Sequence, residues 1–74
     1  MDLELNDVDE NTRFEVKLQI SLYNTALKVF REDRKEDFER YMLERVEKIK
    51  RILGIEVQSF RVLENGNVIF EVRE

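Results

Sequence analysis

The stretch RFEVKLQISLYNTALKVFRE, residues 13–32, decides the fold, because it contains the strongest strand signal in the chain. From Arg13 onward, apolar and polar side chains alternate over about ten residues, and this period of 2 is typical of a strand with one buried face. The apolar members of the alternation are Phe14, Val16, Leu18, Ile20 and Leu22. We therefore predict a strand that begins near Arg13 and ends near Tyr23.

The second half of this stretch, residues 24–32, fits two structures. It is either a strand that returns from a turn at Asn24 and Thr25, or the opening of a helix that continues to Leu53. Such a helix would be about 43 Å long, whereas a ten-residue strand spans about 33 Å, so the helix would overhang its sheet. The charged run REDRKED would also leave nearly two helical turns without an apolar contact. We therefore place a strand at 26–31, with the helix as the alternative.

A helix over residues 34–53 is predicted by its apolar stripe. At about 100° per residue, the stripe occupies an arc of about 140°. Its members are Phe38, Tyr41, Met42, Val46, Ile49, Ile52 and Leu53. Asp33 and Glu36 fit an acidic variant of the N-terminal capping box, and Gly54 supplies the left-handed residue that commonly ends a helix.

A second hairpin is predicted from SFRVLENGNVIF, residues 59–70. Asn65 and Gly66 are a strong signal for a two-residue type I′ turn. With that turn, Phe60 lies opposite Glu71, and alternate pairs share a face of the sheet. Three apolar residues then point away from the helix: Phe60, Val62 and Ile69.

The expected fold is α+β, in the order hairpin, helix, hairpin (ββαββ). One four-stranded sheet carries a single long helix on one face, and the other face is open. A first turn at Asn24 and Thr25 adds Ala26 and two aromatic residues to the open face. The candidate interface on it comprises Tyr23, Phe30, Phe60, Val62 and Ile69.

Two alternatives would remove this apolar face. A β-bulge near Gln58 and Ser59 turns Phe60 and Val62 toward the core, because the parity of the apolar positions switches there. The N-terminal segment could instead fold over the open face, using its apolar residues Leu3, Leu5 and Val8.

We divide the chain into an acidic, partly ordered N-terminal segment, residues 1–12, and a single α+β domain, residues 13–74. A domain of 74 residues is small. Such a domain buries only roughly 60% of its unfolded surface, and oligomerisation is a common source of further stability. A homodimer is therefore the favoured arrangement, with another protein as the alternative partner.

Composition argues against several kinds of partner. With 17 acidic and 13 basic residues, the formal charge of −4 opposes binding to nucleic acid and to anionic membranes. No apolar run approaches the roughly 20 residues of a membrane span. The absence of cysteine is compatible with a reducing compartment. We expect a soluble, cytoplasmic protein that does not bind membranes.

An enzymatic function is not expected. The chain has neither histidine nor cysteine, so the usual acid/base group near neutral pH, the thiolate nucleophile and the commonest metal ligands are missing. Neither glycine belongs to a phosphate-binding loop. We expect no catalytic residue, no cofactor, no metal and no small-molecule substrate.

Two arginines stand where the patterns place apolar residues. Arg45 falls within the apolar arc of the helix, and Arg61 falls on the core-side face of the second hairpin. Both are candidates to bind an anion or a partner's carboxylate through a fixed guanidinium. The alternative is an ion pair within the chain, to Glu15 or Glu56.

The expected function is a non-enzymatic protein-interaction or self-assembling module. A designed scaffold without biological activity fits the same features, because the caps and turns agree with one simple fold. The alternative function is binding of nucleic acid, or of a protein that handles it, through the open sheet face. That function needs aromatic platforms beside cations, here Tyr23, Phe30 and Phe60 with Lys17, Lys28 and Arg73.

Overall fold

The computed structural model describes residues 2–73, and these residues form two helices and a small sheet. The chain runs through β1 (Asp2–Glu4), the single 3₁₀ turn η1 (Leu5–Asp7), α1 (Glu10–Glu32), α2 (Glu36–Leu53), β2 (Val57–Val62) and β3 (Val68–Val72). The sheet is antiparallel, with the strand order β1-β3-β2. The N-terminal strand therefore pairs with the last strand of the chain.

The predicted fold class is wrong in its strand and helix content. We expected four strands and one long helix, whereas the structure has a three-stranded sheet and two helices. Both strands predicted within residues 13–31 belong to α1. Residues 2–12 hold β1, η1 and the start of α1.

The apolar residues of α1 satisfy a helical period as well as the period of 2. Val16 and Ile20 are buried, and Tyr23 and Leu27 continue the same stripe at spacings of three and four residues. Phe14 and Leu18, which alternation would bury in a strand, are 71% and 50% exposed. A helix is the better solution because it places the deeply buried positions of this stretch on one side.

The helix predicted over residues 34–53 is confirmed as α2, which begins at Glu36. Gly54 ends it in the left-handed conformation, with φ 69°. The N-cap is Lys35, which makes no capping hydrogen bond through its side chain, so the capping box predicted at Asp33 is wrong. Asp33 instead ends α1, and the charged run forms the connection on which the two helices turn back.

The second hairpin is confirmed, but its two-residue turn is wrong. The backbone N–H of Gly66 donates to the carbonyl of Leu63 at 3.0 Å, and the N–H of Leu63 donates to the carbonyl of Asn67 at 2.8 Å. Gly66 has a φ of 88°, and every residue with a positive φ within residues 2–73 is a glycine. This is a three-residue loop, a type I turn followed by a left-handed glycine.

The longer loop shifts the strand register by one residue. Phe60 lies opposite Phe70 instead of Glu71. Because side chains alternate between faces, this shift turns the whole of β2 over, and Phe60 and Val62 face the helices. A β-bulge at Gln58 then returns Val57 to the helix side, where it is buried, so the bulge considered from the sequence is confirmed.

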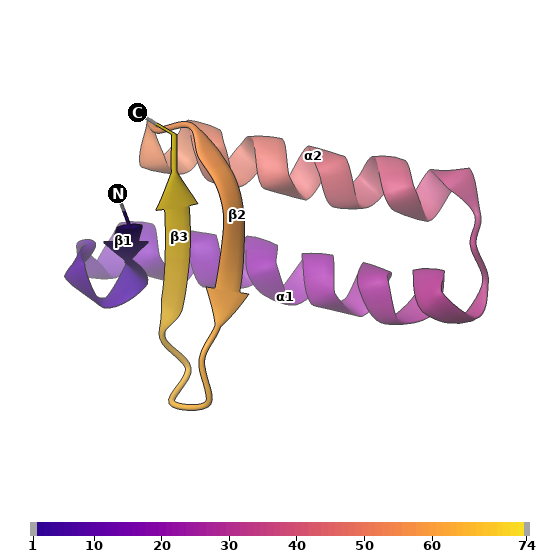
Figure 1. Cartoon of the computed structure of the whole chain (residues 1–74), viewed down its shortest axis with the longest axis horizontal. Coiled ribbons are helices and arrows are strands. Elements are labelled where there is room, and N and C mark those ends of the chain that lie inside the picture. Colours follow the sequence, from indigo (N-terminus) through magenta and orange to yellow (C-terminus); the bar gives the residue numbers. More distant parts are fainter. Residues whose placement is uncertain (1, 74) are drawn as a thin grey trace.

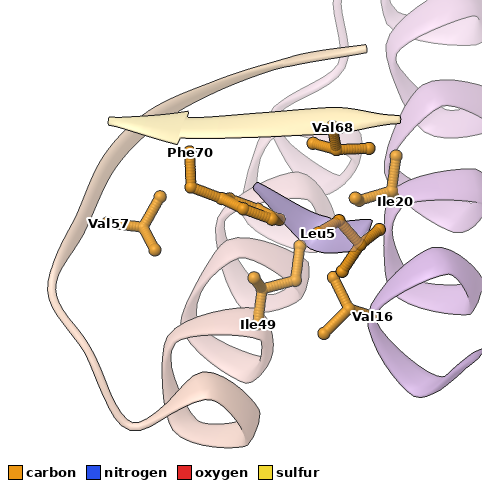
Figure 2. Packing of buried hydrophobic residues seen from close by; sticks show 7 residues of the cluster. All are labelled: Leu5, Val16, Ile20, Ile49, Val57, Val68 and Phe70. Carbon is orange, nitrogen blue, oxygen red and sulfur yellow. The ribbon is translucent and has the colours of Figure 1, made fainter. Parts of the chain in front are cut away.

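The core lies between the sheet and the two helices (Figure 2). Its buried members are Leu5, Val16, Ile20, Ile49, Val57, Val68 and Phe70. Leu5 comes from η1 and is fully buried, so the N-terminal segment fills the core instead of covering the outer face of the sheet. Each fully buried side chain of this size contributes roughly 1.5–3 kcal/mol to stability.

The sheet covers only one end of the helical hairpin, and the part next to the α1–α2 connection extends beyond it (Figure 1). The molecule measures 35 × 26 × 20 Å along its principal axes. The two helices therefore have two sides: one carries the sheet, and the other is without a covering layer among the described residues.

Candidate interaction surface

The structure brings two of the predicted interface residues together inside the protein. The rings of Tyr23 and Phe60 meet edge to face, with centroids 5.3 Å apart and an interplanar angle of 69°. The ring of Phe60 also lies 6.0 Å from that of Phe70, which is fully buried. This aromatic cluster joins α1 to β2 on the helix side of the sheet, a contact favoured by ring electrostatics as well as by burial.

The other three predicted interface residues do not join them on one open face. Phe30 is half-buried and lies two turns further along α1 than Tyr23, a distance of about 10 Å. Val62 is 50% exposed at the edge of the helix-facing side. Ile69 points to the outer face, since its neighbours Val68 and Phe70 are buried on the inner one.

The outer face of the sheet is polar. One row across the three strands consists of Glu4, Ile69 and Arg61, and the next consists of Asp2, Glu71 and Ser59. The hydroxyl of Ser59 donates to Glu71 Oε2 at 3.1 Å, which confirms that this row shares a face. Ile69 is the apolar member of these rows, so the outer face offers little surface for hydrophobic association.

The free edge of the sheet at β2 is also poorly suited to pairing with another strand. The bulge at Gln58 interrupts the regular spacing of its backbone N–H and C=O groups. Natural proteins use such irregularities to block edge-to-edge pairing.

Three of the four large, exposed apolar side chains of the helices gather on the side of α1 away from the sheet. At 100° per residue, Phe14, Leu18 and Val29 lie about 160–220° around α1 from buried Val16. They are 71%, 50% and 38% exposed. We define the sheet-distal face as Phe14, Leu18, Leu22, Val29, Phe38 and Tyr41.

A groove of about 380 Å³ lies in this face, near the connection between the helices. It is lined by residues of α1 and α2: Leu22, Thr25, Ala26, Val29, Asp37, Phe38 and Tyr41. Asp37 is its one charged member, and no residue of a strand takes part. The groove is thus a feature of the helical hairpin alone.

The sequence contained a signal for this face that the strand prediction obscured. Leu18, Leu22, Thr25 and Val29 follow one another at spacings of four, three and four residues. This is the a/d spacing of helices that pack along a seam. It indicates a second contact stripe only once residues 13–32 are known to be helical.

Arg45 lies between the two helices, and its guanidinium group already contacts other residues of the chain. Its Nη1 donates to Gln19 Oε1 at 3.2 Å, and its Nη2 lies 3.8 Å from Glu44 Oε2. The guanidinium carbon also sits 4.7 Å from the centre of the Tyr41 ring, a cation–π contact. Its Nε is buried without a hydrogen-bond partner, so Arg45 presents no open fork to an anion.

Neither acid suggested by the sequence pairs with Arg45. Glu15 lies on the exposed side of α1, and Glu56 Oε2 lies 3.8 Å from Lys50 Nζ. Arg61 is exposed on the outer face of the sheet, opposite Ile69, and not on the core side as predicted. Its fork is open to solvent, where a bound carboxylate gains little.

Two of the cations named for nucleic-acid binding lie on the same side of α1, about 17 Å apart along the helix. Lys17 and Lys28 line a shallow depression of about 430 Å³ beside Val62 and Gly66. The aromatic residues named with them do not line it. In the described part of the chain, no three acidic side chains gather closely enough to hold a metal ion.

The N-cap of α1 has a carboxyl group with a shifted pKa. The pKa of Asp9 is lowered from 3.8 by hydrogen bonds from Thr12, first from its side chain and then from its backbone N–H. Asp9 caps α1, so this shift belongs to helix capping.

Within residues 2–73, neither helix contains an apolar stretch suited to crossing a lipid bilayer. Comparison with protein-family models, with curated proteins and with solved structures gives no match for this chain.

Proposed function

We propose that this chain is a non-enzymatic protein-interaction module that binds protein through the sheet-distal face. The observation that carries the proposal is the exposure of Phe14, Leu18 and Val29 beside an apolar groove. Contiguous apolar surface of this kind on a soluble domain marks a binding site more often than scattered single residues do. A chain without cysteine is compatible with binding in the cytoplasm.

The composition of the two broad faces supports the choice of the helical side. The outer face of the sheet places Glu4, Arg61 and Glu71 around one isoleucine. The sheet-distal face instead contributes large aliphatic and aromatic side chains from two helices. Burial of apolar area is the main favourable term in protein association, so the helical face is the better binding surface.

Nucleic-acid binding has weaker support. The ring of Phe60 packs against Tyr23 and Phe70, so it is not free to stack on a base. Acidic residues also line the outer face of the sheet, where a phosphate backbone would be repelled.

Position-specific photo-crosslinking tests the proposal. We would place p-benzoylphenylalanine at Leu18 in the full chain, with Arg61 on the outer sheet face as the matched exposed control. The expected result is a discrete protein adduct from position 18, in cells or with the purified chain, and none from position 61. Equal yields at the two positions, or no adduct at either, would overturn the proposal and favour a scaffold without binding activity.

A further inference from the structure

We infer that the partner on the sheet-distal face is a second copy of the chain, and that Phe14 of each copy enters the helical groove of the other. This inference rests on the proposed function and specifies its partner. It is carried by two features on one face: Phe14, the most exposed large apolar side chain within residues 2–73, and a groove with an almost wholly apolar lining.

The two features are placed so that a twofold axis satisfies both at once. The α1 residues of the groove centre near Thr25 and Ala26, about 17 Å along the helix from Phe14. An axis perpendicular to α1, midway between them, sets the α1 helices of the two copies antiparallel. A twofold contact is reciprocal, so each Phe14 then meets the partner's groove.

The residues at the centre of this arrangement are also apolar. The axis passes near Leu18 and Leu22, so Leu18 of one copy packs against the partner's Leu22. Leu18 is 50% exposed in the single chain, and Leu22 lines the groove. The contact therefore runs without a gap from one Phe14 to the other.

The groove is large enough to take an aromatic ring. A cavity of about 150 Å³ holds a benzene ring, whereas the groove measures about 380 Å³ and is open. The broad side of the molecule measures 35 by 26 Å, and the dimer contact would use most of it. A standard stable interface takes roughly 800 Å² per partner.

A reciprocal charge exchange tests the pairing of Phe14 with Thr25. Both residues are exposed, so Phe14→Lys and Thr25→Glu are compatible with the folded chain. Each variant alone puts a charge into both contacts of its homodimer and should weaken association about tenfold or more. In the mixture, the introduced lysine and the introduced glutamate meet at one contact, and the native Phe14 and Thr25 meet at the other, so a heterodimer should form.

Sedimentation equilibrium is the measurement, with circular dichroism as the check on folding. The wild-type chain should reach twice 9.0 kDa, with little dependence on salt because the contacts are apolar. The control Leu43→Lys changes an exposed leucine outside the face and should leave the dimer intact. The double variant Phe14→Lys/Thr25→Glu places opposite charges at both contacts and should dimerise by itself.

Three outcomes would overturn the inference. In the first, the wild-type chain stays monomeric up to millimolar concentration. In the second, both single charged variants dimerise as strongly as the wild-type chain. In the third, the two single variants are folded but form no heterodimer when they are mixed. Any of these, combined with a position-18 adduct to a different protein, would leave the proposed function standing. Absence of every adduct at position 18 would remove both.

Discussion

Asn67 donates a hydrogen bond from its side-chain Nδ2 to Glu4 Oε1 at 3.1 Å, across 63 residues of sequence. The Oδ1 of the same side chain accepts from the backbone N–H of Asn6 at 3.2 Å and of Val68 at 2.9 Å. Asn67 is 6% exposed, so these bonds are largely shielded from water. One amide thus fastens the N-terminal segment to the hairpin loop.

Replacing this amide should loosen the N-terminal segment. Asn67→Ala leaves backbone N–H groups without their acceptor, and we expect a loss of about 2 kcal/mol in the free energy of unfolding. Denaturant titration followed by circular dichroism measures it. Asn24→Ala, at an exposed position of α1, is the matched control and should cost nothing.

A second set of variants tests the hydrogen bond between Asn67 and Glu4. Asn67→Asp keeps the Oδ1 acceptor but sets a carboxylate against Glu4, so it should also destabilise the protein at neutral pH. Adding Glu4→Gln should recover most of that loss. If the double variant were no more stable than Asn67→Asp, the bond between these two side chains would contribute little.

The contact between Tyr23 and Phe60 should appear as an energetic coupling within one chain. We expect the double-mutant cycle of Tyr23→Leu and Phe60→Leu to give a coupling of about 1 kcal/mol, because the rings meet edge to face. The same cycle with Arg61→Ala in place of the Phe60 change should give a coupling near zero. If instead the Tyr23 and Phe60 variants dissociated an oligomer and left the unfolding free energy of the monomer unchanged, these two residues would belong to an interface between chains.

Because Gln58 is the extra residue of the bulge, we expect strand β2 to tolerate its deletion. Removing Gln58 leaves Val57 opposite Val72 and Ser59 opposite Glu71, as they are now, so the inner face should be preserved. We expect a change of about 1 kcal/mol or less in unfolding free energy. Cross-strand nuclear Overhauser contacts between Phe60 and Phe70 should persist.

Deletion of Arg61 is the matched comparison. It turns Phe60 to the outer face of the sheet, because side chains alternate along a strand. We expect this variant to lose about 3 kcal/mol or more. Similar stabilities for the two deletions would contradict the register described here.

The cap of α1 should give a dependence on acid pH. The lowered pKa of Asp9 means that the unfolded chain binds a proton more readily than the folded one. The stabilisation is fully present above about pH 4, the ordinary range for Asp, and is lost as the pH falls through the lowered pKa of the folded state. Asp9→Asn has an amide oxygen for the N–H of Thr12 but no ionisation, so its stability should lack this step.

Unfolding free energies measured between pH 6 and pH 2 check this expectation. The advantage of the wild-type chain over Asp9→Asn should shrink below about pH 4. Glu64→Gln, in the exposed hairpin loop, is the control and should not reproduce the loss. A constant difference across the range would show that ionised Asp9 does not stabilise the helix.

The sequence correctly placed two residues of the predicted interface beside one another. Tyr23 and Phe60 were grouped by counting outward from two turns, and they do meet, but on the inner side of the sheet. The sheet-distal face was missed because Phe14 and Leu18 were counted as one side of a strand. Exposure of these residues depends on how α1 packs, which no local pattern records.

The segments whose local signals agree could be predicted from the sequence. Helix α2 follows from an apolar stripe ended by Gly54, and the β2–β3 hairpin follows from two apolar runs around Asn65 and Gly66. In these segments, periodicity, turn residues and caps favour one structure at short range.

Long-range packing selects the helical state of residues 13–32 and the register of the hairpin. The apolar residues of α1 fit periods of 2 and of 3.6 alike, and packing against α2 and the sheet favours the helix. The register depends on whether the loop holds two residues or three, and the three-residue loop pairs Phe60 with Phe70 over the core. Burial of side chains from distant parts of the chain is what separates these alternatives, because their local energies are close.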